Sequence, residues 1–355
     1  MSKYSIMMNK VNKLEEAVLN KFRQDVQNQV DDLPPDDMAR LNQEYFQFAH
    51  NDFTEAERTG YSNYSYWGSA VRMFFKNKVG IVTFAILLIT VGFSLIQPLL
   101  PGQVDPTHIH NFPEGHHMAG MFIRNAQPGE HGFFMGSNAI GQDMWARIWA
   151  GTRNSLFIGL SVALISMTVG IIFGMLWGYV RQLDFFFTEF YNIVNNIPQT
   201  IILLLASIIF GPSIPVLILA MCFWGWIGHA HGIRNLTLIY RDREFNLASR
   251  CLGTGVLKVV KRNLLPQMVS VIMLRMALAI PAAITAEVFL SYLGLGISAA
   301  TPTLGNLLET GRGIMLSADL RYQLLLPAAV LSVIAICFYL AGNAFSDSAD
   351  PRNHV

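Results

Sequence analysis

The sequence predicts an all-α integral membrane protein with six transmembrane helices. Three observations lead to this prediction: 52% of the 355 residues are hydrophobic, only 14% are charged, and the apolar residues gather in long runs. Ordinary soluble domains are about a quarter charged, whereas a helix needs about 20 apolar residues to cross a bilayer. The six runs are residues 79–100, 155–180, 187–210, 214–231, 269–290 and 324–345.

Basic residues beside the first run predict the orientation. Arg72, Lys76 and Lys78 immediately precede it, and the cytoplasmic flanks of membrane helices are enriched in Lys and Arg. We therefore expect the N-terminus in the cytoplasm, and six crossings return the C-terminus to the same side. The transmembrane domain then covers residues 79–355, with external loops at residues 101–154 and 291–323 and a cytoplasmic loop at residues 232–268.

The chain before the first run divides into two parts. Residues 1–66 are polar, and we expect a cytoplasmic extension with a flexible joint at Pro34 and Pro35. Residues 67–78 combine aromatic and basic side chains, a pattern typical of a helix in the inner membrane interface. The alternative is that they form the cytoplasmic end of one long first helix.

Glycines recur every four residues in the second run. Gly170, Gly174 and Gly178 would lie on one helix face and permit the close approach of another helix. This spacing indicates a helix bundle or a dimer interface but no particular function.

A basic, amphipathic insert, residues 243–266, separates the fourth run from the fifth. Read as a helix, it has an apolar face and a mostly basic face. The apolar face consists of Phe245, Ala248, Leu252, Val256 and Val259, and the opposite face of Arg243, Arg250, Thr254, Lys258 and Lys261.

Two glycines and a proline predict how the insert is divided. Gly253 and Gly255 would each cost about 1 kcal/mol inside a helix, so we expect a bend between two short helices. Pro266 is expected to end the second helix where the fifth span begins. Such an element can transmit a movement of a soluble partner to the membrane helices. The alternative is a connecting loop whose basic residues only fix the topology.

Polar residues within the runs are candidates for a translocation path, because polar side chains inside a bilayer are costly and face protein or water. Asn192, Asn195, Asn196 and Gln199 follow helical spacing near the cytoplasmic end of the third run. Their amides can donate to and accept from a peptide backbone; the alternative is amide bonding between helices. Glu287, near the external end of the fifth run, is a further candidate for the translocation path; in an ion-driven carrier it would be a proton site.

Histidines cluster in the first external loop. The motifs "HIH" and "GHH" are patterns that can bind a transition metal. A solvated loop that faces a soluble protein is the alternative that we favour, so no metal site is predicted. The histidines are His108, His110, His116, His117 and His131.

The insert resembles the EAA loop of ABC-importer permeases, whose pattern is Glu-Ala-Ala, three residues, Gly, nine residues, then Ile-x-Leu-Pro. Two positions depart from it: Leu247 replaces the usual Glu, and Asn263 replaces the Ile, although Glu244 could supply an acid one turn earlier. The resemblance implies a coupling helix that contacts an ATPase. The predicted coupling residues are Arg243, Glu244, Leu247, Ala248, Ser249, Gly253, Leu265 and Pro266.

Three more segments are similar to the oligopeptide/dipeptide branch of these permeases: "MGSNAIGQDMWARIWAGTRNSL", "AEVFLSYLGLGISAATPTLGNLL" and the C-terminal "DSADPR". Asn138 and Gln142 replace the usual Asp and Arg of the first segment. In the second, Glu287 would be a packing or gating contact. The resemblance, strongest to the second permease subunit of Gram-positive oligopeptide importers, covers about residues 66–355. The matching external motif includes Gly136, Gly141, Asp143, Gly151 and Arg153.

The resemblance implies a multi-pass permease subunit of the cytoplasmic membrane that moves oligopeptides by alternating access. Its implied partners are a second homologous permease, two ATPase subunits, an external peptide-binding lipoprotein and the lipid bilayer, with no nucleic acid. The sequence lacks a Gly-x4-Gly-Lys-Ser/Thr phosphate loop, which ordinarily cradles ATP. We therefore expect no cofactor in this chain, ATP and Mg being bound by the partner ATPases.

Two alternatives remain open at this point. The same class of permease could carry nickel or another small solute. A different class, a proton-coupled secondary transporter, would use Glu287 but gives no role to the basic insert. We identify no catalytic constellation, so the chain is not expected to be an enzyme.

Overall fold

The computed structural model describes residues 66–114 and 116–349 and, alone, Gln24. The chain divides into two units, Met1–Tyr64 and Ser65–Val355, and the elements described below belong to the second. The predicted polar extension and its joint lie outside the described residues, as do the last residues of the "DSADPR" segment.

The described part of the chain is helical, with three isolated β-bridges in one loop. Five helical segments are long and apolar enough to cross a membrane, and α7 with α8 makes a sixth if the bent pair counts as one span. The helices are α4 (Tyr66–Phe74), α5 (Lys78–Ile96), α6 (Met144–Tyr179), α7 (Arg181–Asn195), α8 (Gln199–Phe210), α9 (Ile214–Arg241), α10 (Glu244–Cys251), α11 (Val256–Val259), α12 (Leu265–Tyr292), α13 (Leu304–Gly313) and α14 (Tyr322–Ser348).

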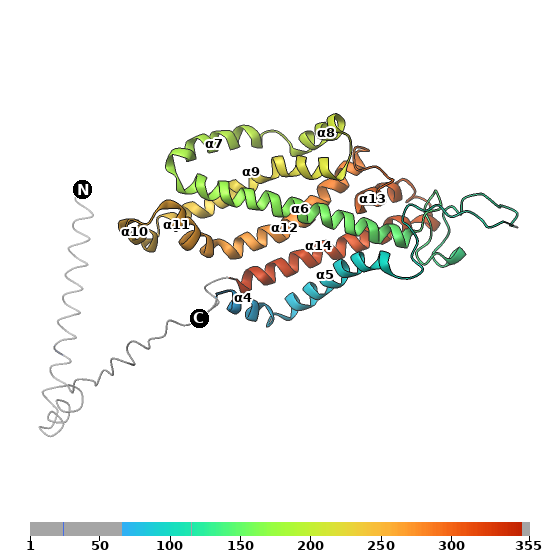
Figure 1. Ribbon diagram of the computed structural model, residues 1–355, viewed down its shortest axis with the longest axis horizontal. Coiled ribbons are helices and arrows are strands. Elements are labelled where there is room, and N and C mark those ends of the chain that lie inside the picture. The colour runs from blue at the N-terminus through green and yellow to red at the C-terminus, as the bar shows by residue number, and fades with distance from the viewer. Residues whose placement is uncertain (1–23, 25–65, 115, 350–355) are drawn as a thin grey trace, which may run out of the picture. The chain divides into compact units, whose positions relative to one another are not determined.

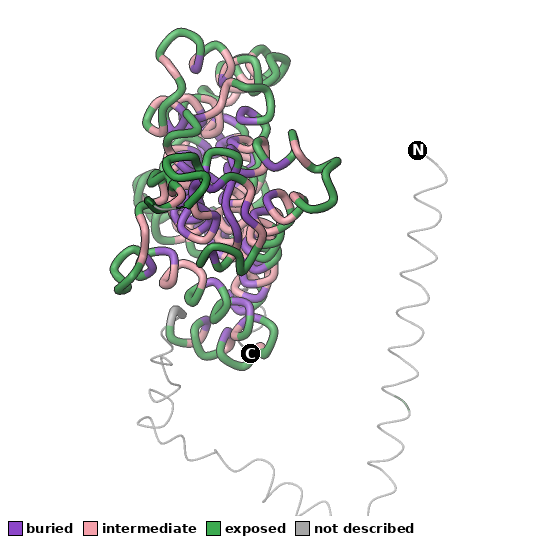
Figure 2. Tube along the Cα trace, turned by 90° about the vertical axis from the view of Figure 1, so that its right-hand side faces the viewer, coloured by how far each residue is buried: buried purple, intermediate pink, exposed green. Residues whose placement is uncertain are grey.

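The long helices lie side by side in one bundle (Figure 1). α10 and α11 lie at one end of it, which we call the α10 end. α13 and the loop of residues 100–143 lie at the other, the α13 end. Buried residues concentrate along the middle of the bundle (Figure 2), where α6, α9 and α12 supply most of the apolar core.

The glycine face predicted in the second span packs α6 against α9. A Cβ added at Gly170 would lie 2.7 Å from the His229 Cβ, and one at Gly178 would lie 2.7 Å from the Thr237 Cβ. At Gly174 the added Cβ would overlap the Ala230 carbonyl oxygen. The predicted close helix approach is confirmed, and it lies within this chain.

The third predicted span is not one straight helix. α7 and α8 are bent by 73° at the break that follows Asn195, and Pro198 lies in that break. Proline lacks an N–H and disfavours helical geometry at the residue before it, here Ile197. The break follows 15 residues of α7 and precedes 12 residues of α8, so the polar stripe lies near the middle of this segment rather than near one end.

Several helices extend beyond the apolar runs. α6 begins eleven residues before the predicted second span, with Asp143 as its N-cap residue, and α9 continues ten residues past the fourth. α13 lies inside the segment predicted as the second external loop. The apolar run measures the part of a helix that matches the hydrocarbon layer, whereas caps and local hydrogen bonds determine where the helix ends.

The lead-in predicted at residues 67–78 contains α4 as a separate helix. Asn77 caps α5, because its side chain accepts a hydrogen bond from the Gly80 N–H at 3.1 Å. The alternative of one long first helix is therefore wrong. The ring of Phe74 packs on Phe84 and Phe345, with centroids 5.7 and 5.8 Å away, which fixes α4 against α5 and α14.

The predicted bend in the insert is confirmed, but the role expected of Pro266 is wrong. α10 and α11 are separate helices, and Gly253 between them has a φ of +76°, a conformation that favours glycine. Pro266 does not end the second helix. It lies in the first turn of α12, and α11 leads into α12 through the π-helical turn Val260–Leu264. A local π-helical adjustment of this kind accommodates the hydrogen bond that proline cannot donate.

Candidate functional site

Two side-chain amides fix α10 to the bundle. Asn246 is fully buried, and its Nδ2 donates to the Tyr240 carbonyl oxygen at the end of α9, at 2.8 Å. Asn263 Nδ2 donates to the Ser249 Oγ at 2.9 Å. Asn263 departs from the EAA pattern, and here it joins α10 to the π-helical turn before α12. A displacement of α10 would therefore pull on both α9 and α12.

A group of charges surrounds the start of α10. The Asp242 carboxylate forms ion pairs with Arg241 and with Arg250, each at 3.2 Å. Arg250 also donates to the Arg241 carbonyl oxygen at 2.8 Å. Hydrogen bonds from the Arg241 guanidinium, and secondarily from Arg250, hold the pKa of Asp242 below its ordinary value.

The apolar face predicted for the insert lies mostly on the surface. Phe245, Ala248, Leu252 and Val256 are exposed, Leu252 by 86%, and of the five predicted residues only Val259 is buried. A surface helix normally turns its apolar face inward. An exposed apolar patch of this kind marks an interaction surface.

The other predicted coupling residues surround this patch. Arg243 is the N-cap residue of α10, Glu244 and Leu247 are exposed, and Leu265 is half-buried. Glu244 forms no ion pair with a described residue. The structure therefore brings the predicted residues together on one end of the bundle but shows no internal salt bridge at Glu244.

The four polar residues of the third span gather at the α7–α8 break, all exposed. Asn195 and Gln199 line a cavity of about 260 Å³ whose opposite wall includes Gly228 of α9. The Asn196 amide donates to the carbonyl oxygen of Asn192 within the same helix. In the described part of the chain, no side-chain hydrogen bond links these amides to another helix, as the alternative of interhelical amide bonding would require.

The residues of the motif predicted for the first external loop mostly have structural roles at the α13 end. Gly136 and Gly141 each have a φ of +80°. Asp143 accepts from the Trp145 N–H at 3.0 Å and caps α6, and burial raises the pKa of this carboxyl. Gly151 lets α6 approach the start of α13, because an added Cβ would lie 3.1 Å from the Thr303 carbonyl carbon.

The two departures from the family motif contact each other. Asn138 Nδ2 donates to Gln142 Oε1 at 2.9 Å, and Gln142 Nε2 donates to the Thr107 carbonyl oxygen at 3.1 Å. Arg147 donates to the same Gln142 oxygen and to the carbonyl oxygen of Ala299. These bonds join the loop to α6 and to the segment before α13. Arg153, the remaining motif residue, is half-buried.

The family model for the "binding-protein-dependent transport system inner membrane component" matches residues 167–355, more than half of the chain. The chain belongs to this family. A second model, the N-terminal transmembrane domain of oligopeptide transport permease C, matches residues 65–113. The resemblance to ABC-importer permeases is thereby confirmed, and the chain is a multi-pass membrane permease rather than an enzyme.

Relatives of this permease match along almost their whole lengths. The oligopeptide transport system permease protein AmiD of Streptococcus pneumoniae is 33% identical over 320 residues, which cover 89% of this chain and 100% of AmiD. The dipeptide transport system permease protein DppC of Bacillus subtilis is 30% identical over 325 residues, with coverages of 91% and 98%. The oligopeptide permease OppC of Haemophilus influenzae is 28% identical over 315 residues, with coverages of 88% and 97%.

Glu287 of the permease lies in a buried polar cluster rather than at a surface of this chain. Its side chain is fully buried. Thr303 Oγ1 donates to the carboxyl at 2.7 Å, Ser291 Oγ at 3.2 Å and Ser155 Oγ at 3.4 Å. The side chain of Glu287 would also overlap a Cβ added at Gly305. The cluster joins α12 to α6 and α13, and the role of Glu287 in the translocation path stays a prediction.

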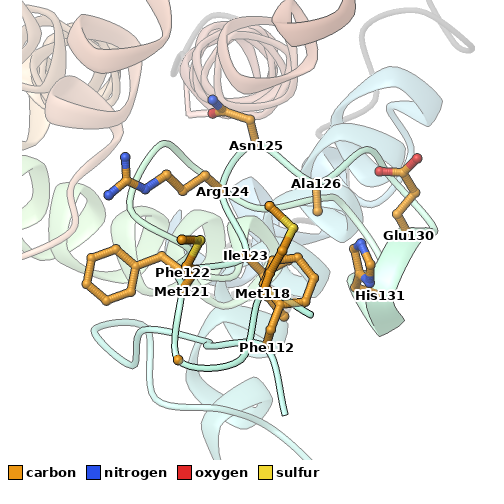
Figure 3. Close-up of a pocket in the computed structure, with 11 residues that line it drawn as sticks. Phe112, Met118, Met121, Phe122, Ile123, Arg124, Asn125, Ala126, Glu130 and His131 are labelled. Carbon is orange, nitrogen blue, oxygen red and sulfur yellow. The ribbon is translucent and has the colours of Figure 1, made fainter. Parts of the chain in front are cut away.

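The histidines of the loop contact aromatic rings. Phe112 stacks on His116 with centroids 4.7 Å apart, and the His131 ring meets Phe112 edge-on. Both Phe112 and His131 line a cavity of about 570 Å³ with Met118 and Phe122 (Figure 3). Among the described residues, no group of three or more His, Cys, Asp or Glu side chains could hold a metal ion.

A polar group on α7, α9 and α12 was not predicted from the sequence. Tyr191 stacks on His231 with centroids 4.0 Å apart, and Arg234 pairs with Asp184 at 2.7 Å. Arg275 of α12 lies beside them along α9. A signal for Arg275 was available, because it is the one Lys or Arg in the fifth predicted span.

Proposed function

We propose that this chain is a permease subunit of an ATP-driven ABC importer that moves oligopeptides across the cytoplasmic membrane by alternating access. The observation that carries the proposal is the match over 89% of the chain to a relative named as an oligopeptide transport system permease. The other two relatives described above are also named as peptide permeases.

The geometry of α10 supports its proposed role as the coupling helix. Its exposed apolar patch offers a surface to an ATPase subunit, and Asn246 and Asn263 would carry its displacement to α9 and α12. In this proposal the α10 end and both termini face the cytoplasm. A second homologous permease, two ATPase subunits that bind ATP and Mg, and an external peptide-binding lipoprotein complete the importer.

The α7–α8 break supports a proposed peptide path. The exposed amides of Asn195 and Gln199 line a cavity, and amides can pair with both the donors and the acceptors of a peptide backbone. Glu287 is assigned to packing, since its carboxyl is buried among three hydroxyl donors.

Neither alternative is favoured. Membership in a binding-protein-dependent family argues against a proton-coupled secondary transporter, which needs no binding protein. A nickel permease would gain support from a metal-ligating cluster, and the described residues hold none of three or more ligands.

The test is uptake by the complete transporter in proteoliposomes. The permease is purified with its encoded partners and supplied with a labelled oligopeptide, the binding protein outside and ATP inside. We expect uptake that requires ATP, stops with vanadate and continues when a protonophore removes the pH gradient. Uptake driven by a pH gradient without ATP, or ATP-dependent uptake of nickel but of no peptide, would refute the proposal.

A further inference from the structure

Arg275 is a cationic residue within a membrane-spanning helix. It is the eleventh residue of α12 (Leu265–Tyr292), and its side chain is half-buried. Charged groups within membrane-spanning helices are costly, face protein or a water-filled cavity, and mark substrate or ion pathways. Its surroundings therefore indicate what Arg275 binds.

Gly232 of α9 provides the space that the Arg275 guanidinium occupies. A Cβ added at Gly232 would lie 2.7 Å from Cζ and 3.0 Å from Nη2 of Arg275. Any side chain larger than hydrogen at position 232 would displace the guanidinium from this place. The guanidinium of Arg275 thus has a defined position against Gly232 of α9.

The guanidinium has no anionic partner within the described part of the chain. No ion pair or hydrogen bond of Arg275 joins it to a described residue. Neighbouring α7 carries two acids: Asp184 is paired with Arg234 at 2.7 Å, and Glu189 is exposed and forms no ion pair with a described residue. Glu287 lies twelve residues further along α12, about 18 Å at 1.5 Å per residue, and is hydrogen-bonded within its own cluster. The positive charge of Arg275 is therefore not balanced by an ion pair within the described residues.

The position of the Arg275 guanidinium beside Gly232 is next to the cavity at the α7–α8 break. Gly228 lies one helical turn before Gly232 on α9 and lines that cavity together with Asn195 and Gln199. No atom lies within 4 Å of a Cβ added at Gly228, so the surface is open there. An extended chain along this face of α9 would meet the amides and the guanidinium in succession.

We propose that Arg275 binds the C-terminal carboxylate of the peptide as it crosses the membrane, while Asn195 and Gln199 face the peptide backbone. This inference rests on the proposed peptide transport. A guanidinium pairs with a carboxylate through two parallel hydrogen bonds. Every linear peptide has this carboxylate whatever its sequence, so the site would suit a carrier of mixed peptides.

The test compares a peptide that has a free C-terminal carboxylate with the same peptide amidated. ATP-driven uptake is measured against peptide concentration for the wild-type complex, for Arg275→Gln, and for Gly232→Ala, which displaces the guanidinium without removing it. We expect the KM for the free acid to rise about tenfold in both variants, with the KM for the amide unchanged. Arg275→Lys keeps the charge and should retain part of the preference for the acid.

Gly92→Ala in α5 is the matched control, because no atom lies within 4 Å of a Cβ added there; it should behave as wild type. The external binding protein is the same in every assay, so a changed acid-to-amide ratio reports on the permease. An unchanged ratio of acid to amide uptake in Arg275→Gln would overturn this inference but not the proposed function. The same holds if uptake of both peptides falls equally and the second permease is lost from the complex, since Arg275 would then pair with that subunit. A wild-type complex that takes up no peptide would overturn the proposed function as well.

Discussion

At the α13 end of the permease, the polar cluster around Glu287 is buried and paired within the chain, whereas at the α10 end apolar side chains lie on the surface. Glu287 and Thr303 are fully buried and hydrogen-bonded to each other, and Thr303 with Asn306 forms a capping box at the start of α13. Phe245 and Leu252 of the basic insert are exposed.

The difference shows which region has its interactions satisfied within this chain and which region has a surface left for a partner. A buried polar group without a partner costs about 1–3 kcal/mol, so the paired cluster at the α13 end stabilises the fold by itself. An exposed apolar patch gains free energy only when another surface covers it. We therefore expect changes at the α13 end to affect stability and changes in the apolar patch to affect assembly and transport.

The largest effect is expected from Glu287→Ala. The change removes the acceptor of three hydroxyl donors and leaves a cavity, which together cost about 3 kcal/mol of unfolding free energy. The apparent melting temperature of the purified permease should fall by several degrees. Glu244→Ala is the control at the α10 end; this acid is exposed, and the change should stay within about 0.5 kcal/mol. Equal losses in both variants would contradict the comparison.

A smaller effect, on assembly rather than on stability, is expected from Ala248→Glu and Leu252→Glu. Each places a charge in the apolar patch, and covering an unpaired charge is unfavourable. We expect at least about a tenfold loss of peptide uptake, or about 1.4 kcal/mol, and weaker co-purification of the ATPase subunits, with an unchanged melting temperature. Leu316→Glu, at an 89% exposed residue of the α13 end, should leave ATPase retention unchanged. Full uptake by the α10 variants would remove the coupling assignment.

The smallest effect concerns the charges at the start of α10. The pKa of Asp242 is lower in the folded chain than its ordinary value, so the folded state binds the proton less readily. The stabilisation is present above the ordinary pKa of about 3.9 and is lost as the pH falls through the lower folded value. Since Asp242 is half exposed, salt screens its pairs and the contribution is below about 1 kcal/mol.

Melting curves of the wild-type protein and Asp242→Asn over about pH 3–6 measure this contribution. We expect the wild-type protein to be slightly more stable at the upper end and the difference to shrink toward the lower end. High salt should reduce it at every pH. A difference that grows as the pH falls would have the wrong sign for these ion pairs.

Much of the fold could be predicted from the sequence, because the responsible signals are local. Each predicted span falls on helical segments of the structure, the third on a broken pair. The spacing of Gly170, Gly174 and Gly178 correctly indicated a close helix approach, and Gly253 marked the bend after α10. These features follow from hydropathy, helical periodicity and backbone freedom.

The candidate site was predictable only in part. The sequence named Asn195 and Gln199 and the residues of the insert, but it placed no bend at Pro198 and expected Pro266 to end a helix. The early start of α6 went unpredicted because its first turns are not apolar throughout. The charge of Arg275 within a span could have been noticed, but its place against Gly232 of α9 could not be predicted. His231 was missed because its partner Tyr191 lies on another helix.

The sequence by itself determined the all-helical membrane class, the basic amphipathic insert and the family, since each depends on residue types at short spacing. Only the tertiary structure decided that Glu287 is buried, that the insert's apolar face is exposed and that Arg275 lies against Gly232. The physical reason is that burial and pairing are properties of contacts between helices. Those contacts join residues such as Ser155, Glu287 and Thr303, which are far apart along the chain.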